Sequence, residues 1–405
     1  MATELAWQTT SGLPAPAADP WRATLAGLAA SLVGLGLARF AYTPLLPAIV
    51  DAHWFDAADA AWLAAANLSG YLAGALAATA MAARWSARGV LRAMMLLATV
   101  TLLACAWPVA FAWFFAWRFL AGAAGGALMV LAAPTILPHI DPARRGLAGG
   151  AVFLGVGLGI AASGSLVPVL LSHGLAATWL ALGALSLALT VLAWAGWPAP
   201  GAPGPAKPAH RDDRLPVAAL RVVYAEYALN AVGLVPHMIF LVDFVARGLG
   251  QGLAAGAHMW VLFGVGAVAG PVVGGLVADR TGFRTALRLA FALQVAAAWL
   301  PAFGLAGAWL GVSSVVMGAF TPGIVGLVLG RLHEVLAHYP ASHKLAWSRA
   351  TTAFAVLQAA AAYGMSLLLV RSGGHHAPLF AVGGAAIALA LAIDLAAPRF
   401  LRETA

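Results

Sequence analysis

The chain is a succession of long apolar runs separated by short polar segments. A transmembrane helix needs about 20 apolar residues to cross the hydrocarbon core. The sequence has twelve such runs, at 23–50, 58–83, 90–111, 113–139, 146–172, 174–196, 218–246, 254–278, 285–306, 308–332, 345–370 and 377–397. Only 9% of the residues are charged, so a soluble fold, in which about 25% are charged, would lack a polar surface. The sequence therefore predicts an all-α protein of the lipid bilayer with twelve transmembrane helices.

One polar stretch divides the runs into two groups of six. Residues 197–216 read WPAPGAPGPAKPAHRDDRLP. The prolines exclude a continued helix, and a charged, proline-rich composition is typical of a solvated linker. We therefore expect six-helix bundles over 23–196 and 217–397, joined by this linker, with short tails at 1–22 and 398–405.

Basic residues alternate between the segments that join the predicted spans. Arginines such as Arg84 and Arg280 occupy every second segment, whereas the opposite loops carry only Arg247 and Arg371. Because cytoplasmic loops are enriched in Lys and Arg, we expect both termini and the linker to be cytoplasmic. The excess of arginine over lysine and the abundant alanine point to a bacterial source, and hence to the bacterial inner membrane.

The two predicted bundles share an internal repeat. A shift of 196 residues aligns Arg84, Arg88, Arg92, Gly70 and Gly74 with Arg280, Arg284, Arg288, Gly266 and Gly270. Two repeats of six helices are an architecture of secondary transporters. The expected fold is thus twelve transmembrane helices in two pseudo-symmetric six-helix bundles.

Residues 275–284, GLVADRTGFR, combine glycines with charges at the end of span 8. The pattern predicts close helix approach, charges at the membrane boundary and a tight turn, at Gly275, Asp279, Arg280, Gly282 and Arg284. This stretch resembles the signature loop of the major facilitator superfamily, G-x-L-x-D-R-x-G-x-R, with Val277 in place of leucine. The resemblance implies a gating loop. In the first half, Ala83 replaces the aspartate, which puts the gating salt bridge of that copy in doubt.

Spans 4 and 5 carry further motifs. Arg118 lies four residues before Gly122, a spacing that resembles the fourth span of the superfamily. A charge in hydrocarbon must face a cavity or a partner, or else snorkel to the interface, and both alternatives are open for Arg118. Span 5 resembles the glycine-rich motif of the antiporter branch, although Ile160 replaces its proline. Close helix packing is the expected role of its glycines, Gly155, Gly159 and Gly164.

Spans 1 and 2 supply the main candidates for solute binding. Arg39 and Tyr42 are three residues apart and are expected on one helical face, with Arg39 too deep to snorkel. Asn67 and Tyr71 lie in the stretch NLSGYLAG. These segments resemble the uncharacterised YbfB/YjiJ-type bacterial branch of the superfamily, which implies a transporter without an assigned substrate.

Span 7 carries a polar stripe formed by Glu226, Asn230, Gly233 and His237 on one helical face. Buried polar groups must be wetted or partnered, so Asn230 and His237 are expected to line a cavity. Burial favours the neutral form of a carboxyl, which suits Glu226 as a proton-coupling group. The alternative is a helix-end carboxylate wetted by the cytoplasm. Further cavity candidates are Gln358, Thr351 and Asp243.

Other classes of function lack support in the sequence. The single cysteine, Cys105, excludes a thiolate metal cluster, and the pair His375–His376 has no supporting ligands. There is no Walker loop, no paired carboxylates and no basic patch with aromatic residues between its charges. We therefore expect no enzyme activity, no cofactor, no bound metal and no nucleic-acid partner.

Together these features predict secondary active transport of a small organic solute by alternating access, as a symporter or an antiporter. Arg39 and Arg118 favour an anionic or zwitterionic solute, and Glu226 favours coupling to protons; we expect a monomer. Two alternatives are efflux of drugs or metabolites in exchange for protons, and a membrane sensor or assembly factor that transports nothing. The buried polar residues count against the sensor, because leucine would serve a bundle without a solute.

Overall fold

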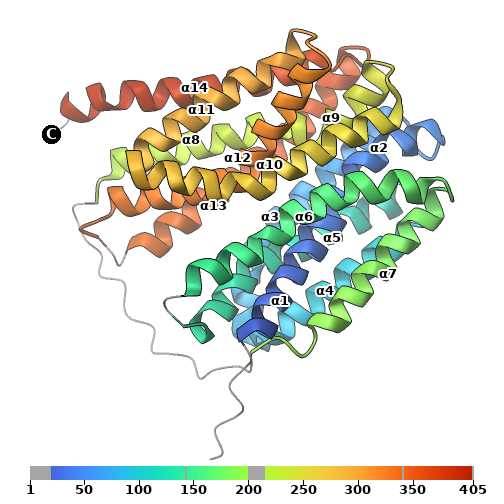
Figure 1. The fold of residues 1–405 in the computed structure, drawn as a ribbon, viewed down its shortest axis with the longest axis horizontal. Helices are drawn as coiled ribbons and strands as arrows, with labels where there is room; N and C mark the ends of the chain where they lie inside the picture. The colour runs from blue at the N-terminus through green and yellow to red at the C-terminus, as the bar shows by residue number, and fades with distance from the viewer. Residues whose placement is uncertain (1–19, 142–143, 199–214, 340–341, 404–405) are drawn as a thin grey trace, which may run out of the picture.

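The computed structural model describes residues 20–141, 144–198, 215–339 and 342–403 (Figure 1). In this part of the chain, twelve helices are long and apolar enough to cross a membrane. They form two bundles that lie against each other (Figure 1), so the predicted fold class is confirmed.

The first bundle contains α1 (Pro20–Ser31), η1 (Leu32–Phe40), α2 (Tyr42–Asp51), α3 (Ala57–Trp85), α4 (Ala87–Ala104), α5 (Phe111–Ile136), η2 (Leu137–His139), α6 (Arg145–Leu171) and α7 (Leu175–Ala193). The second contains α8 (Val217–Val235), η4 (Pro236–Phe240), α9 (Leu241–Asp243), η5 (Phe244–Gly248), α10 (Gly252–Thr281), α11 (Phe283–Ala302), α12 (Ala308–Val335), α13 (His343–Arg371) and α14 (Ala377–Glu403). The first span comprises α1 to α2, and the seventh comprises α8 to η5.

Most predicted span limits agree with the helices to within a few residues. The largest difference is in span 3, where α4 ends at Ala104 and not near residue 111. Pro108 follows this end and disfavours a helical conformation at Trp107. At the other end of the chain, α14 continues past residue 397 to Glu403. Residues 199–214 of the predicted linker and the tail before Pro20 lie outside the described residues, so those expectations stay predictions.

The internal repeat extends to the contacts between helices. A Cβ added to Gly70 of α3 would lie 1.9 Å from the carbonyl oxygen of Phe119 in α5. At the matching place in the second bundle, a Cβ on Gly266 would lie 2.1 Å from the oxygen of Val315. Phe119 and Val315 are themselves 196 residues apart. The bundles therefore repeat the same close crossing, α3 on α5 and α10 on α12, because only glycine lets two backbones approach so closely.

The first and seventh spans are interrupted by π-helical segments. Leu32–Phe40 forms the π-helix η1, and the backbone N–H of Ala41 donates to the oxygen of Gly36 at 3.0 Å. The seventh span contains η4, which begins at Pro236, and η5. Short π segments inside helices are frequent at functional sites. The first and seventh spans, which contain the three segments, occupy corresponding places in the two bundles.

The bundles meet through α6 with α10, α3 with α13, and α2 with α9. A Cβ on Gly157 or Gly164 of α6 would lie 2.8 Å from Val268 or Val261 of α10, respectively. The two ends of the molecule carry different side chains. The basic end carries Arg84, Arg92, Arg284 and Arg331, where α3 and α12 end and α4 and α11 begin; the opposite end carries the loop between α2 and α3, and η5.

Candidate functional site

Arg39 joins the two bundles near the middle of the first span. Its Nη2 donates to Oε1 of Gln358 in α13 at 2.9 Å. The guanidinium carbon lies 5.1 Å from the ring centroids of both Phe40 and Tyr71. Nε2 of Gln358 in turn contacts Sδ of Met238 in η4 at 3.7 Å. We call these five residues, Arg39, Phe40, Tyr71, Met238 and Gln358, the inter-bundle cluster.

Further contacts surround the inter-bundle cluster. The hydroxyl of Thr43 donates to the carbonyl oxygen of Met238 at 2.6 Å. The hydroxyls of Ser69 and Tyr363 lie 3.1 Å apart, and the rings of Trp62 and Tyr363 are 5.1 Å apart. Each of these contacts crosses from the first bundle to the second. The surface around Arg39 is therefore shared by both bundles, and a rotation of one against the other would change it.

Arg118 lies inside the first bundle and is only 1% exposed. Its Nη1 donates to the oxygen of Ala38 at 2.8 Å, and its guanidinium lies 4.2 Å from the ring centroid of Tyr42. Snorkelling to the interface, one of the two alternatives from the sequence, is therefore excluded by the structure. The cation–π contact and the carbonyl acceptor are the partners that hold this charge in the bundle.

Tyr42 and Asn67 also point into the first bundle. The Tyr42 hydroxyl donates to the oxygen of Ala60 at 2.8 Å, and Nδ2 of Asn67 donates to the oxygen of Arg118 at 3.1 Å. The expected shared face of Arg39 and Tyr42 is wrong, because Arg39 reaches the other bundle. The π-helix η1 ends between them, and a π turn rotates each residue by less than an α turn does.

The two arginines make this region strongly positive. Neither Arg39 nor Arg118 forms an ion pair with any described residue. A guanidinium in a low-dielectric interior is costly without an opposite charge. Of the two, Arg39 is half-buried and Arg118 fully buried, so only the guanidinium of Arg39 is partly accessible.

The polar stripe of the seventh span faces a different place. Nδ2 of Asn230 donates to Oε1 of Gln294 in α11 at 2.8 Å, and Nε2 of His237 lies 2.8 Å from Oγ of Ser313 in α12. Both contacts are inside the second bundle, so the structure does not bring Asn230 and His237 together with Arg39. Their predicted part in solute binding stays a prediction. Gln294 and Ser313 were missed, although each is a polar residue in an apolar run.

The gating loop places its charges at the basic end. Gly282 has φ +81° and ends α10 in the turn expected of it. Asp279 and Arg280 are exposed, whereas Nε of Arg284 lies 3.4 Å from Oδ1 of Asp394 in α14. Arg288 also forms an ion pair with Asp394. The contacts of Arg284 thus tie helices of one bundle together.

The glycines assigned to helix packing differ in their surroundings. A Cβ on Gly122 would lie 1.9 Å from the oxygen of Asn67, and one on Gly155 or Gly159 would meet the first span at 2.4 or 2.3 Å. Gly164 packs on α10 of the other bundle. Gly275 departs from expectation, because an added Cβ would meet open space; α10 has no close neighbour at that turn.

A cluster of charges closes the opposite end of the second bundle. Asp243 is 0% exposed and accepts from Nη2 of Arg247 at 2.9 Å, while Nε2 of His376 lies 2.7 Å from its Oδ2. His376 begins the approach to α14. The predicted cavity role of Asp243 stays untested, and its partners indicate that it fixes η5 to α14.

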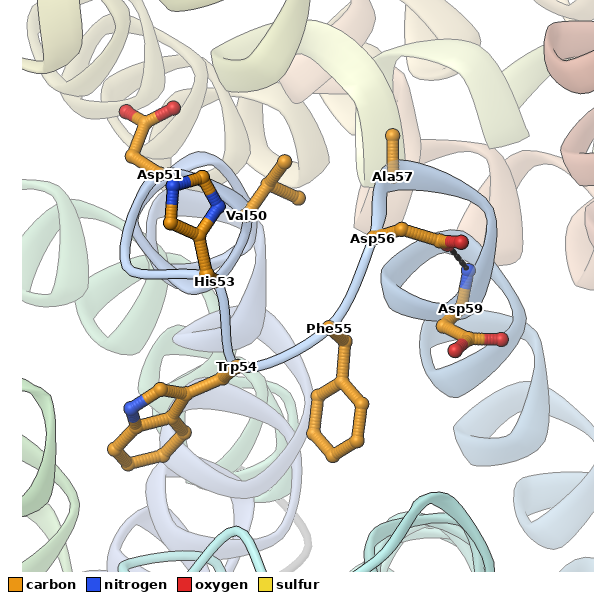
Figure 2. A pocket seen from close by; sticks show the side chains of 8 residues that line it. All are labelled: Val50, Asp51, His53, Trp54, Phe55, Asp56, Ala57 and Asp59. Carbon is orange, nitrogen blue, oxygen red and sulfur yellow. Dashed lines mark hydrogen bonds between the residues drawn. The ribbon is translucent and has the colours of Figure 1, made fainter.

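A pocket of about 720 Å³ lies in the loop between α2 and α3 (Figure 2). Its lining includes Asp51, His53, Asp56 and Asp59. Asp56 caps α3, since its Oδ1 accepts from the backbone N–H of Asp59 at 2.7 Å (Figure 2). None of the residues predicted for solute binding lines this pocket, and the carboxylate of Asp56 already caps α3. In the described part of the chain, no group of three His, Cys, Asp or Glu side chains could hold a metal ion.

Solved structures with the same fold are transporters. The chain resembles a bacterial homolog of the human lysosomal transporter Spinster in its inward-facing, unoccupied conformation, with 14% identity and a TM-score of 0.64, over 95% of this chain and 96% of that chain. The inward-facing, occupied conformation of the same homolog matches with 14% identity and a TM-score of 0.68, over 94% and 97%. At this identity the likeness establishes the fold.

The sequence itself matches one family model. The family is described as the uncharacterised MFS-type transporter YbfB, and the match covers residues 31–395. A comparison with curated proteins returns no significant match. The family and the fold point to a transporter and not to an enzyme. This chain is an integral membrane protein of the YbfB-type family of the major facilitator superfamily, a secondary transporter that works by alternating access.

Proposed function

We propose that this transporter carries a small anionic or zwitterionic solute and binds it at the inter-bundle cluster. One observation supports the proposal above others: the guanidinium of Arg39 lies between the bundles, half-buried and without an ion-pair partner among the described residues. A planar guanidinium binds a carboxylate or phosphate through two parallel hydrogen bonds. Phe40 and Tyr71 beside it offer apolar and aromatic surface for the rest of the solute.

The bond from Arg39 to Gln358 suggests how binding is linked to alternating access. Gln358 is a neutral acceptor at 2.9 Å, whereas a carboxylate or phosphate carries the opposite charge and can accept two parallel hydrogen bonds from the guanidinium. An anionic group would therefore replace Gln358 at the guanidinium. Since Gln358 belongs to the second bundle, its release removes a link between the bundles and favours their rotation.

Three finer features belong to the same proposal. Glu226 carries the coupling proton, because it is a carboxyl 1% exposed within a span. The basic end faces the cytoplasm of a bacterial inner membrane, because arginine is retained on that side. The protein works as a monomer, since each chain supplies both bundles that the site requires.

The test is thermal stabilisation of the purified protein across a library of small metabolites. A ligand present at 100 times its Kd adds about 2.7 kcal/mol to the free energy of unfolding. We expect hits among carboxylates, phosphates or amino acids, with a weaker apparent affinity in Arg39→Lys, which keeps the charge but not the planar fork. Arg371→Lys, at the end of α13, is the matched control. Hits confined to cations, or equal affinity in Arg39→Lys, would refute the proposal.

A further inference from the structure

Three polar side chains of α8 and α11 are buried inside the second bundle, toward the basic end. Glu226 and Asn230 lie one turn apart on α8, and Asn230 bonds to Gln294 of α11. Their exposed fractions are 1%, 0% and 0%. We call Glu226, Asn230 and Gln294 the polar layer.

The polar layer contains buried atoms without partners. Oε1 of Glu226, Oδ1 of Asn230 and Nε2 of Gln294 make no hydrogen bond to any described residue. Leaving such an atom unpaired is unfavourable because its lost hydrogen bonds to water are not replaced, and nearly all buried polar groups in proteins have a partner, either protein or ordered water. Two acceptors and one donor in one layer are the surroundings in which a buried water makes its usual two to four bonds.

The layer lies next to the charges of the basic end. Four charged groups on three other helices act electrostatically on Glu226: Asp394 of α14, Arg331 of α12, and Arg284 and Arg288 of α11. The three arginine side chains are 19% to 33% exposed, whereas the side chain of Asp394 is buried, at 6%. The solvent-exposed end of the second bundle therefore lies close to Glu226.

Toward the opposite end, the layer is closed by an apolar side chain. Gly233, one turn beyond Asn230, is covered by Ile387 of α14, whose Cγ1 would lie 2.1 Å from an added Cβ. The next polar group on the same face is His237. The Ser313 hydroxyl gives its single proton to the oxygen of Ala297 at 2.7 Å, so it can only accept from Nε2 of His237.

His237 is therefore an acceptor at its other nitrogen. With the proton on Nε2, Nδ1 carries a free lone pair, and it has no partner among the described residues. Ile387 thus stands between a carboxyl on one side and a second acceptor on the other. A side chain in this place prevents a continuous leak of protons through the bundle, which a coupled transporter must avoid.

We propose that bound water fills the polar layer and exchanges protons between the basic end and Glu226, along a path inside the second bundle that is separate from the inter-bundle cluster. This inference rests on the proton coupling proposed above. It assigns the solute and the proton to different compartments, one between the bundles and one within a bundle. The first bundle has no equivalent carboxyl, because position 30, which precedes Glu226 by 196 residues, is Ala30.

The test is hydrogen–deuterium exchange of the Glu226 carboxyl, followed by infrared spectroscopy of the full-length protein in lipid. The band is the carbonyl stretch of a protonated carboxyl that Glu226→Gln removes. On transfer to D₂O we expect it to shift promptly in the wild type. Asn230→Leu fills the layer with an apolar side chain and should slow the shift by about tenfold, the factor for about 1.4 kcal/mol in a barrier.

The matched control is Gln251→Leu, the same kind of amide replacement at the exposed start of α10, which should leave the exchange rate unchanged. If Asn230→Leu fails to fold, Gln294→Leu tests the same layer. A band that does not shift in the wild type, or that never appears at any pH, overturns the inference. So does slowing by Gln251→Leu with none by the layer variants. Because D₂O is the probe and no solute or gradient is used, failure of the proposed transport would not produce these results.

Discussion

Gly270 offers a quantitative test of the close crossing between α10 and α12. A Cβ at this position would lie 1.9 Å from the carbonyl oxygen of Ala319. Because real Cβ contacts are essentially never shorter than 3.0 Å, Gly270→Ala must push the two helices apart by about 1 Å. Overpacking of this kind costs about 1–3 kcal/mol, and the rigid carbonyl leaves no flexible side chain to absorb it.

Gly275, five residues further along the same helix, is the matched control. An added Cβ there meets open space. Alanine exceeds glycine in helix propensity by about 1 kcal/mol at either site, so this gain cancels in the comparison. We expect Gly270→Ala to unfold with a free energy about 1–3 kcal/mol below that of Gly275→Ala.

The measurement is reversible unfolding in mixed micelles with increasing denaturing detergent. The repeat adds an independent check, because a Cβ on Gly74 would lie 2.0 Å from the oxygen of Ala123, and Gly74→Ala should lose a similar amount. Equal stabilities of Gly270→Ala and Gly275→Ala would refute the argument. If Gly270→Ala lowered the free energy of unfolding and Gly74→Ala did not, the two equivalent crossings would contribute differently to stability.

Three further predictions address the charges and the orientation. Asp243→Asn should lower the free energy of unfolding by about 3 kcal/mol, because Arg247 and His376 lose a buried carboxylate. The control Asp56→Asn, at the exposed cap of α3, should change this free energy by less than about 0.5 kcal/mol. Equal effects of the two variants would contradict the prediction. For a solute identified by the stabilisation screen, Glu226→Gln should abolish uptake against a concentration gradient, while exchange of labelled for unlabelled solute continues. Unimpaired uptake would contradict the assignment of the proton to Glu226. Reporter fusions after Ala202 should report cytoplasm, and fusions near Gly174 and Gly374 the outside; an outside signal at Ala202 would invalidate the proposed orientation.

The sequence was sufficient to predict the helices, since hydropathy over 20 residues depends on composition and not on tertiary contacts. It was also sufficient for the pseudo-symmetry, because a glycine at a backbone crossing has no substitute. The environment of single polar residues could not be predicted in the same way. An α-helical wheel puts Arg39 and Tyr42 on one face, but the π-helix η1 changes the rotation per residue. The sequence LVGLGLARF contains no residue pattern that predicts a π-helix.

The neighbours of the polar stripe in span 7 could not be predicted from the sequence either. Its periodicity predicts that Glu226, Asn230 and His237 share one face, yet periodicity does not say which neighbours those side chains meet. The answer depends on Gln294 and Ser313, which lie 64 and 76 residues from their partners. The prediction of close helix packing at Gly275 was wrong for a related reason. A glycine within a sequence motif does not by itself show that another helix lies beside it.

The π segments of the first and seventh spans have a mechanical consequence. Sharp bends in helices concentrate at π segments, where the regular hydrogen-bond pattern is interrupted. Beyond η1 and η4, the chain continues as α2 and α9, which contact each other across the bundles. The short helices α2 and α9 can therefore move by bending at η1 and η4, while α1 and α8 keep their packing. A movement of α2 and α9 at the opposite end would then require no change in the packing of the two long helices behind them.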